Sequence, residues 1–477
     1  MIAPVVLFWL LMAVGLFSRR AVLLKAFFVL GAFGTFAVLP TNATAGVTIL
    51  PQVTCAIFLL GWLVLRRGAG RDMMTAAFDA RALGLLFLFL AYCAVATGLL
   101  PRLFEGQANV IPFRSTAPGT TPLAPTPSNV TQILYLAISC LTAAGFHILW
   151  RNPDDRPKVM SAIVAGGVAL VLAGIADLAT RGTDALAPFR TASYALMTND
   201  DVIGVKRVVG LMSEASAFGG ACVSLAALLY FLRPGFGFLK RRRWVLTLTV
   251  LSLVAMALAS TSTSAYVGLS VFALLAAVNF FRRAVTARGA LKRIEFIEDM
   301  GALYLIAAIV VLVLLFNRPL VDMASSMFDQ IVLRKSASQS FAERAHWNEV
   351  AMEALRQTNW LGVGIGATRT SSWPIAVVSN AGVIGAALLA VFFLLLFLRR
   401  NEGLAPEMRE AAIGMKLSIL VTMTMAALAA PTPDFGVIVA ASLGGLSGLA
   451  AAVRREQDAR LVAMPRGRIR PKYAGGV

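Results

Sequence analysis

The sequence has few charged residues, and this scarcity excludes an ordinary water-soluble domain. Charged side chains make up 14% of the 477 residues, whereas soluble domains carry roughly 25%. Histidine occurs only twice and cysteine four times, with no His/Cys cluster at metal-ligand spacing. No acidic motif typical of a divalent cation site is present either. The sequence therefore predicts no metal site and no cofactor.

Long hydrophobic runs dominate the chain, of which 58% is hydrophobic. Each run is close to the roughly 20 residues that a helix needs to cross a bilayer. The runs cover residues 2–18, 21–39, 47–65, 82–100, 130–150, 159–178, 215–232, 244–260, 264–281, 301–316, 375–398, 412–430 and 437–453. They do not alternate as barrel strands would. We therefore expect an all-α, polytopic transmembrane helix bundle of about 12–14 spans, forming a single integral membrane domain over residues 1–477.

Acidic residues are outnumbered by basic ones, 24 to 43, and the net charge is +19. The basic clusters follow every second apolar run. They are Arg19 and Arg20; Arg66 and Arg67; Arg151, Arg156 and Lys158; Lys240 to Arg243; Arg282 and Arg283; Arg399 and Arg400; Arg454 and Arg455. This spacing follows the positive-inside rule and favours a lipid bilayer over nucleic acid as the partner. It predicts an outer N-terminus and a basic cytoplasmic tail over residues 454–477.

The longest interruption of the hydrophobic pattern, residues 317–374, is predicted to be an outer loop. Ser340 and Glu343 fit a capping box, and apolar residues then recur at helical spacing. We expect an amphipathic helix over about 341–357, with Arg344 and Asn348 on its polar face. Two further outer segments, 101–129 and 179–213, are also long, and the first is expected to lack regular structure.

Arginines in these outer segments are candidate ligands for phosphate, because guanidinium is permanently charged and binds phosphate oxygens bidentately. The main candidates are Arg207, Arg344 and Arg369. For any single arginine the alternative is a solvated side chain or one that faces lipid headgroups.

Glu214 and His346 are candidates for proton transfer. A carboxylate at a membrane boundary, such as Glu214, is costly unless it is paired or faces a water-filled cavity. Alternatively, Glu214 is favoured there by the dipole of the helix that follows. His346 has the pKa range of a general acid or base, but it is also a common type of interfacial polar residue.

Three segments resemble one family. Residues 343–385, ERAHWNEVAMEALRQTNWLGVGIGATRTSSWPIAVVSNAGVIG, are similar to the signature region of the O-antigen polymerase and ligase superfamily (Wzy-type polymerases and related ligases). The matching residues are Arg344, Trp347, Gly362, Gly364, Gly366, Gly382 and Gly385. Residues 206–220 resemble the start of a middle span in this family, which carries an arginine, a glycine and an acidic residue. Residues 259–269 resemble the Ser/Thr-rich turn between two of its spans. The ligases carry a histidine after the glycine loop, where this chain has RTSSW, so it looks more like the exopolysaccharide-polymerase branch.

The resemblance implies a metal-independent membrane glycosyltransferase. Its donor would be a polyprenyl-diphosphate-linked glycan, with Arg207, Arg344 and Arg369 binding the diphosphate. Glu214, Arg344, Arg369 and His346 are the implied catalytic residues. The resemblance also implies the bacterial inner membrane, a chain-length regulator and a flippase as partners, and no ATP.

Two alternatives stay open at this point. One is an O-antigen ligase that transfers glycan to another carrier. The other is a lipid-linked oligosaccharide flippase or secondary transporter, which should place charged residues near the bilayer midplane on broken helices.

Overall fold

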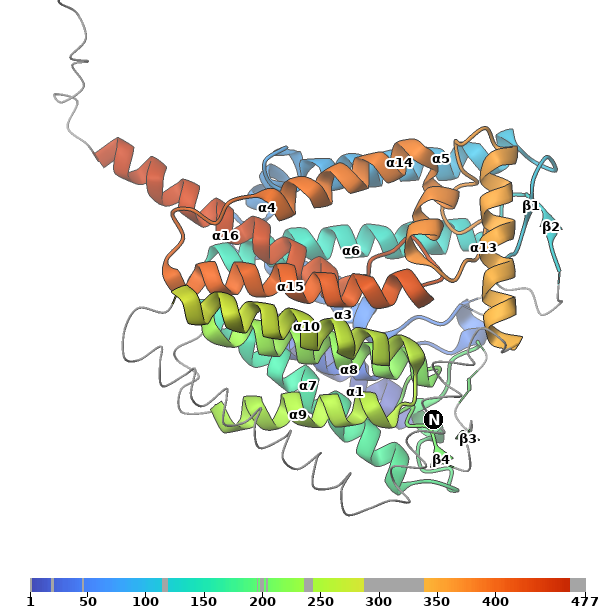
Figure 1. The fold of residues 1–477 in the computed structure, drawn as a ribbon, viewed down its shortest axis with the longest axis horizontal. Coiled ribbons are helices and arrows are strands. Elements are labelled where there is room, and N and C mark those ends of the chain that lie inside the picture. The colour runs from blue at the N-terminus through green and yellow to red at the C-terminus, as the bar shows by residue number, and fades with distance from the viewer. Residues whose placement is uncertain are drawn as a thin grey trace, which may run out of the picture.

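The computed structural model describes residues 2–18, 21–44, 47–113, 119–194, 196–197, 201–202, 205–235, 243–286 and 339–463. In these ranges the chain is mainly helical and its strands are only two residues long, which confirms the predicted all-α bundle (Figure 1). The helices are α1 Ile2–Phe17, α2 Val22–Val29, α3 Pro51–Val64, α4 Ala69–Phe78, α5 Gly84–Leu103, α6 Pro127–Arg151, α7 Arg156–Ala179, α8 Ala215–Leu232, α9 Arg243–Ala259, α10 Thr263–Thr286, α13 Gln339–Gln357, α14 Trp373–Leu398, α15 Pro406–Ala429 and α16 Gly436–Ala463.

Short elements connect these helices. They are the 3-10 helices η1 Leu30–Ala32, η2 Thr41–Thr44, η3 Ala187–Phe189 and η4 Arg233–Gly235, and the strands β1 Asn109–Val110, β2 Thr121–Pro122, β3 Asp201–Val202 and β4 Val205–Lys206. The strands pair antiparallel, β1 with β2 and β3 with β4. The expectation that 101–129 lacks regular structure is therefore wrong, because α5 continues to Leu103, β1 pairs with β2, and α6 begins at Pro127.

Eight helices in the described ranges are long and apolar enough to cross a membrane, namely α5, α6, α7, α8, α10, α14, α15 and α16. The bent pair α3–α4, with an angle of 111°, counts as a ninth if it is one span. Shorter apolar helices are α1, α2 with η1, and α9. Twelve of the thirteen apolar runs thus coincide with helices, and the run 301–316 lies outside the described residues.

Close helix packing at small residues builds the bundle. A Cβ added to Gly444 or Gly448 of α16 would collide with the carbonyl oxygens of Ala143 and His147 in α6, so only glycine permits this approach. His147 Nδ1 also shares a hydrogen bond of 2.9 Å with Ser447 Oγ across the same interface. The helices α6 and α16 therefore form a central pair.

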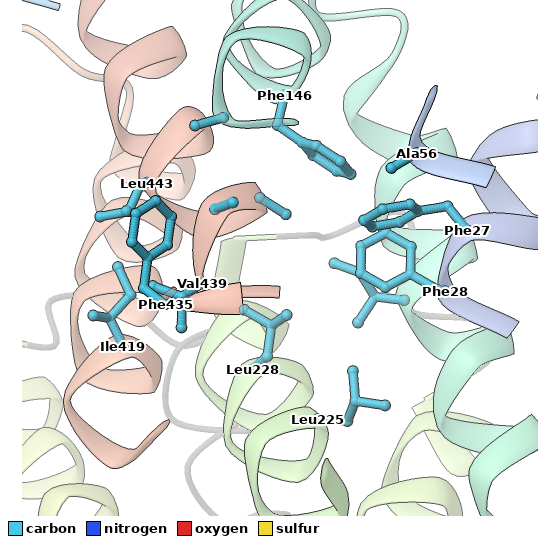
Figure 2. Close-up of a cluster of buried hydrophobic side chains, with 14 of the residues drawn as sticks. Phe27, Phe28, Ala56, Phe146, Leu225, Leu228, Ile419, Phe435, Val439 and Leu443 are labelled. Atoms are coloured by element: carbon cyan, nitrogen blue, oxygen red, sulfur yellow. The ribbon is translucent and has the colours of Figure 1, made fainter. Parts of the chain in front are cut away.

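Aromatic and aliphatic side chains fill the space beside this pair. Phe27 and Phe28 of α2 meet Phe146 of α6, with ring centroids 5.5 and 5.9 Å apart (Figure 2). Leu225 and Leu228 of α8 lie on the other side of the same cluster. The cluster ties α2, α6 and α8 together although they are far apart in the sequence.

The two ends of the bundle differ. At one end α13 lies across the tips of the other helices, and the β-pairs and the start of α1 are at this end too (Figure 1). The opposite end carries ion pairs between helix ends. These are Arg66 with Asp155 (2.8 Å), Arg151 with Asp72, Arg282 with Glu410 (2.5 Å) and Arg454 with Asp79 (3.1 Å). The basic clusters of the described residues are thus gathered at the end away from α13.

The predicted amphipathic helix is confirmed as α13, Gln339–Gln357, which buries Ala351, Ala354 and Leu355. The predicted cap is wrong, because Ser340 lies inside the helix. The first part of the predicted loop 317–374, residues 317–338, and the end of the predicted tail, 464–477, lie outside the described residues.

Candidate functional site

A buried glycine loop follows α13 and organises the end of the bundle on which that helix lies. Residues 362–368 are all buried, although their backbone is irregular. The Val363 and Gly364 amides donate to the carbonyl oxygens of Ser379 and Asn380 in α14, both at 2.9 Å. Irregular backbone is tolerated inside a membrane protein where protein groups satisfy it. The loop is thus an integral part of the helix packing.

A break in α14 makes room for this loop. Gly382 has φ 67° and ψ −179° within α14, and the Val383 amide donates to the Trp360 carbonyl at 3.0 Å instead of continuing the helix. A Cβ at Gly382 would collide with the carbonyl group of Leu361. The break lies nine residues after Trp373, the first residue of α14, or about 14 Å along an α-helix. The loop therefore reaches well into the bundle.

Polar side chains from three helices hold the loop in place. Thr97 Oγ1 of α5 accepts the Ile365 amide at 3.0 Å, and Asn129 Nδ2 of α6 donates to the Ile365 carbonyl at 2.8 Å. Asn380 Oδ1 of α14 accepts the Gly366 amide at 3.1 Å. Because Thr97, Asn129 and Asn380 are buried, these bonds form in a low-dielectric setting where losing one is costly. The loop is thereby rigidly placed.

Arg369 leaves this loop towards α13. Its amide donates to the Ile111 carbonyl at 2.8 Å, and its Cζ lies 3.8 Å from the ring centroid of Trp347. This is a cation–π contact that fixes the guanidinium against α13. The neighbouring Ser371 amide donates to Asn348 Oδ1 at 2.9 Å, so α13 and the loop are joined twice.

The charge of Arg369 interacts with other candidate residues. Burial lowers the pKa of Arg369, Arg344 lowers it further, and the carboxylates of Glu214 and Glu343 oppose the shift. Arg344 and Glu214 therefore each lie within electrostatic range of Arg369, although the three residues are distant in the sequence. Two guanidinium groups beside carboxylates form a site with the charge and donors to bind an anionic group.

Glu214 occupies the N-cap position of α8, with φ −156° and ψ 162°. Its carboxylate accepts a hydrogen bond from the Ser216 hydroxyl. Both interpretations of Glu214 are therefore compatible with its position. The dipole of α8 favours a negative charge at this N-cap, and the same charge interacts with Arg369, as expected for a functional carboxylate.

Arg207, which follows β4 directly, contacts the turn between α9 and α10. Its Nε donates to Thr261 Oγ1 at 3.1 Å and to the Ser260 carbonyl at 3.4 Å. The Val208 amide donates to the Ala259 carbonyl at 3.2 Å beside it. The structure therefore joins the segment 207–214, which carries Glu214, to the Ser/Thr-rich turn.

His346 is exposed on α13, whereas Trp347 and Arg344 are half-buried. Two residues along a helix differ by about 200° in direction, so His346 points away from the side of Arg344. The structure does not bring His346 to the other candidates.

Sequence reasoning missed two acidic residues near this end. Asp177, buried in α7, accepts the amides of Val209 and Gly210 at 2.9 and 3.1 Å and pairs with Arg190 at 2.8 Å. It anchors the segment that leads to Glu214. The available signal was an acidic residue inside the apolar run 159–178.

The second missed residue is Asp434, in the turn between α15 and α16. This turn contacts the loop that carries Arg369, because the Thr370 amide donates to the Pro431 carbonyl at 3.4 Å. Trp373 Nε1, at the start of α14, donates to the Pro433 carbonyl at 3.1 Å. Burial raises the pKa of Asp434 to about 6, although the hydrogen bond from the Gly436 amide acts to lower it. Its signal was a lone carboxylate in the sequence PTPD between two apolar runs.

Among the described residues, no group of three His, Cys, Asp or Glu side chains could hold a metal ion. A comparison of the sequence with protein-family models and with curated proteins finds no match.

Proposed function

We propose that this protein polymerises polyprenyl-diphosphate-linked oligosaccharide repeat units into exopolysaccharide or O-antigen. The observation that carries the proposal is the meeting of three separate segments at the α13 end. The segment 206–220 is hydrogen-bonded to the turn in 259–269, and Glu214 acts electrostatically on Arg369 of 343–385. These are the three segments that resemble the O-antigen polymerase and ligase superfamily.

The reaction is a substitution at the anomeric carbon of the donor glycan. An acceptor sugar hydroxyl attacks this carbon, the bond between carbon and diphosphate oxygen breaks, and polyprenyl diphosphate leaves. Arg344 and Arg369 stabilise the negative charge that develops on the diphosphate. Arg207, which is hydrogen-bonded to the α9–α10 turn, also binds the diphosphate. Glu214 accepts the proton of the acceptor hydroxyl. The glycosyl diphosphate bond supplies the energy.

The proposed orientation follows the charges. The end that gathers Arg66, Arg151, Arg282 and Arg454 faces the cytoplasm, together with the C-terminal tail. The α13 end then faces the periplasm of a bacterial inner membrane, where lipid-linked repeat units would be joined.

A transporter of lipid-linked oligosaccharides is the alternative from a different class, and the broken helix α14 favours it. However, α14 contains no charged residue, and the interacting charges of Arg344, Arg369 and Glu214 lie at the end of the bundle. Charges at a bundle end suit chemistry at the membrane surface better than transport across the midplane.

The test is glycan analysis in a deletion strain complemented with Arg344→Ala, Arg369→Ala or Glu214→Ala, with expression of each variant confirmed. Arg356→Ala is the matched control, because Arg356 lies on α13 but is 60% exposed and pairs with the exposed Glu353. We expect long polymer to fall by on the order of 100-fold in the three site variants and to persist in the control.

The location of the accumulated repeat units separates the alternatives. Single lipid-linked units facing the periplasm support polymerisation. Units facing the cytoplasm would replace the proposal with a flippase, and intact polymer that fails to reach its final carrier would replace it with a ligase.

A further inference from the structure

A basic cavity of about 270 Å³ lies between α14, α15 and α16. The helix ends that line it are at the end of the bundle opposite α13 (Figure 1). Its charged lining residues among those described are Arg81, Arg399, Arg400, Lys416, Arg454 and Glu402. Five cations thus share the cavity with one carboxylate. Its volume is close to the roughly 300 Å³ at the lower end of small-molecule sites.

The positive charge of the cavity is only partly neutralised by protein groups. Arg454 pairs with Asp79 at 3.1 Å, and Arg400 pairs with Glu402 at 3.4 Å. Arg399 donates through Nη2 to the Arg81 carbonyl, whereas its Nη1 is buried and has no hydrogen-bond partner in the described part of the chain. A buried guanidinium nitrogen without an acceptor is costly, and an anion would satisfy it.

The electrostatic setting of Arg399 agrees with this shortage of negative charge. Burial lowers the pKa of Arg399, Arg454 lowers it further, and Asp79 opposes the shift only in part. Cations are therefore held together here against their mutual repulsion.

Lys416 fixes the position of Arg399. It lies inside α15, and its Nζ donates to the carbonyl oxygens of Phe397 and Arg399 at 3.0 and 2.8 Å. These are carbonyls at the C-terminal end of α14, where a cation is favoured by the helix dipole. The lysine thus builds one wall of the cavity and holds the backbone that carries Arg399 and Arg400.

Apart from Asn401 and Gln457, the remaining wall is apolar. Leu396 of α14, Leu446 and Val453 of α16 line the cavity beside the cations. An apolar wall next to a group of cations suits a ligand with an anionic head and a hydrocarbon part.

A topology signal alone explains cations at this end but not their arrangement. The positive-inside rule requires only that basic residues flank the spans. It does not require a cavity, a lysine that braces the helix end, or a buried guanidinium nitrogen that lacks an acceptor.

We propose that this cavity binds a phosphate group, carried by an anionic phospholipid headgroup or present as free phosphate. The site lies at the opposite end from the proposed glycan chemistry and does not depend on it. In the proposed orientation it faces the cytoplasm, where the inner leaflet supplies anionic lipid.

The test uses the full-length protein, purified and delipidated in neutral detergent. Thermal unfolding is measured after addition of phosphatidylglycerol, phosphatidylcholine or inorganic phosphate, and bound lipid is counted by native mass spectrometry. The variants are Arg399→Gln and Arg400→Gln. The second is included because Arg400 is 84% exposed, so its substitution should leave the fold intact. Arg409→Gln is the matched control, since Arg409 is an exposed arginine of α15 that does not line the cavity.

We expect phosphatidylglycerol to raise Tm and phosphatidylcholine not to. Each cavity variant should weaken phosphatidylglycerol binding by on the order of tenfold, and Arg409→Gln should leave it unchanged. Equal protection by inorganic phosphate would support the site and identify free phosphate as its ligand. Equal protection by both lipids, no protection by any addition, or the same loss in Arg409→Gln as in the cavity variants would overturn the proposal.

Discussion

Arg369 stacks on Trp347, with its Cζ 3.8 Å from the ring centroid, and this contact joins the buried glycine loop to the helix that crosses the bundle end. The contact is specific because the flat guanidinium matches the flat indole in shape and charge. It holds the guanidinium of Arg369 where Arg344 and Glu214 interact with its charge.

The stacking contact predicts a graded response to substitution. Trp347→Leu removes the aromatic face and should lower polymer yield about tenfold, because a partly buried cation–π contact contributes on the order of 1 to 2 kcal/mol. Trp347→Phe keeps a face and should stay within a few-fold of the parent. Polymer length distributions from membranes with matched protein levels measure both. Equal yields from Leu and Phe would show that the ring does not position Arg369.

The glycine loop predicts a large effect of a single methyl group. Gly366 has φ 80°, and an added Cβ would lie 2.5 Å from the Ser128 carbonyl oxygen. Gly366→Ala should therefore lower the free energy of unfolding by about 2 kcal/mol or more. Gly98→Ala is the control, because a Cβ at Gly98 in α5 meets no atom within 4 Å. Thermal unfolding in detergent should show a lower Tm for the first variant only.

The ion cluster at the opposite end predicts acid sensitivity. Burial tends to raise the pKa of Asp155, but hydrogen bonds from Arg66 and Lys158 dominate and lower it. Because the pKa of Asp155 is lower in the folded chain, its carboxylate stabilises the fold at any pH above the pKa that aspartate has in the unfolded chain. This stabilisation is lost as the pH falls through the folded-state pKa.

Asp155→Asn should accordingly lower the free energy of unfolding by about 3 kcal/mol at pH 7, because Asp155 is 1% exposed and its two cations lose their partner. The difference in Tm between parent and variant should shrink as the pH falls below the ordinary pKa of aspartate. A difference that is constant from pH 7 to pH 3 would contradict the role of its charge.

Asp434 predicts the opposite pH dependence. Burial raises its pKa from 3.8 to about 6, so the folded state binds the proton more tightly than the unfolded chain. Stability should then rise as the pH falls from 7 to 5, by roughly 1 kcal/mol from this group. Asp434→Asn should lack this rise. Parallel Tm curves of parent and variant over that range would refute the prediction.

Much of the architecture could be predicted because it is a local property of the chain. The helix 341–357 was predicted from apolar spacing and is found as Gln339–Gln357. The break in α14 was not predicted, since residues 375–398 form one uninterrupted apolar run. A helix breaks at Gly382 only because a loop from another part of the chain supplies its hydrogen bonds.

The candidate residues divide in the same way. Arg207, Arg344, Arg369 and Glu214 were predicted from their chemistry, yet nothing in their spacing places Arg369 against Trp347 or the charge of Glu214 near it. Asp177 and Asp434 were missed because an isolated carboxylate has no sequence neighbour that reveals its partners.

By itself, the sequence determined that this is a helical membrane protein, since hydrophobicity and run length act residue by residue. It also determined which ends carry the basic clusters. Only the tertiary structure decided that residues 362–368 are buried, that three distant segments meet beside α13, and that Arg399 lines a cavity. These features depend on contacts between segments far apart in the chain, whose geometry is set by side-chain packing and by the satisfaction of buried polar groups.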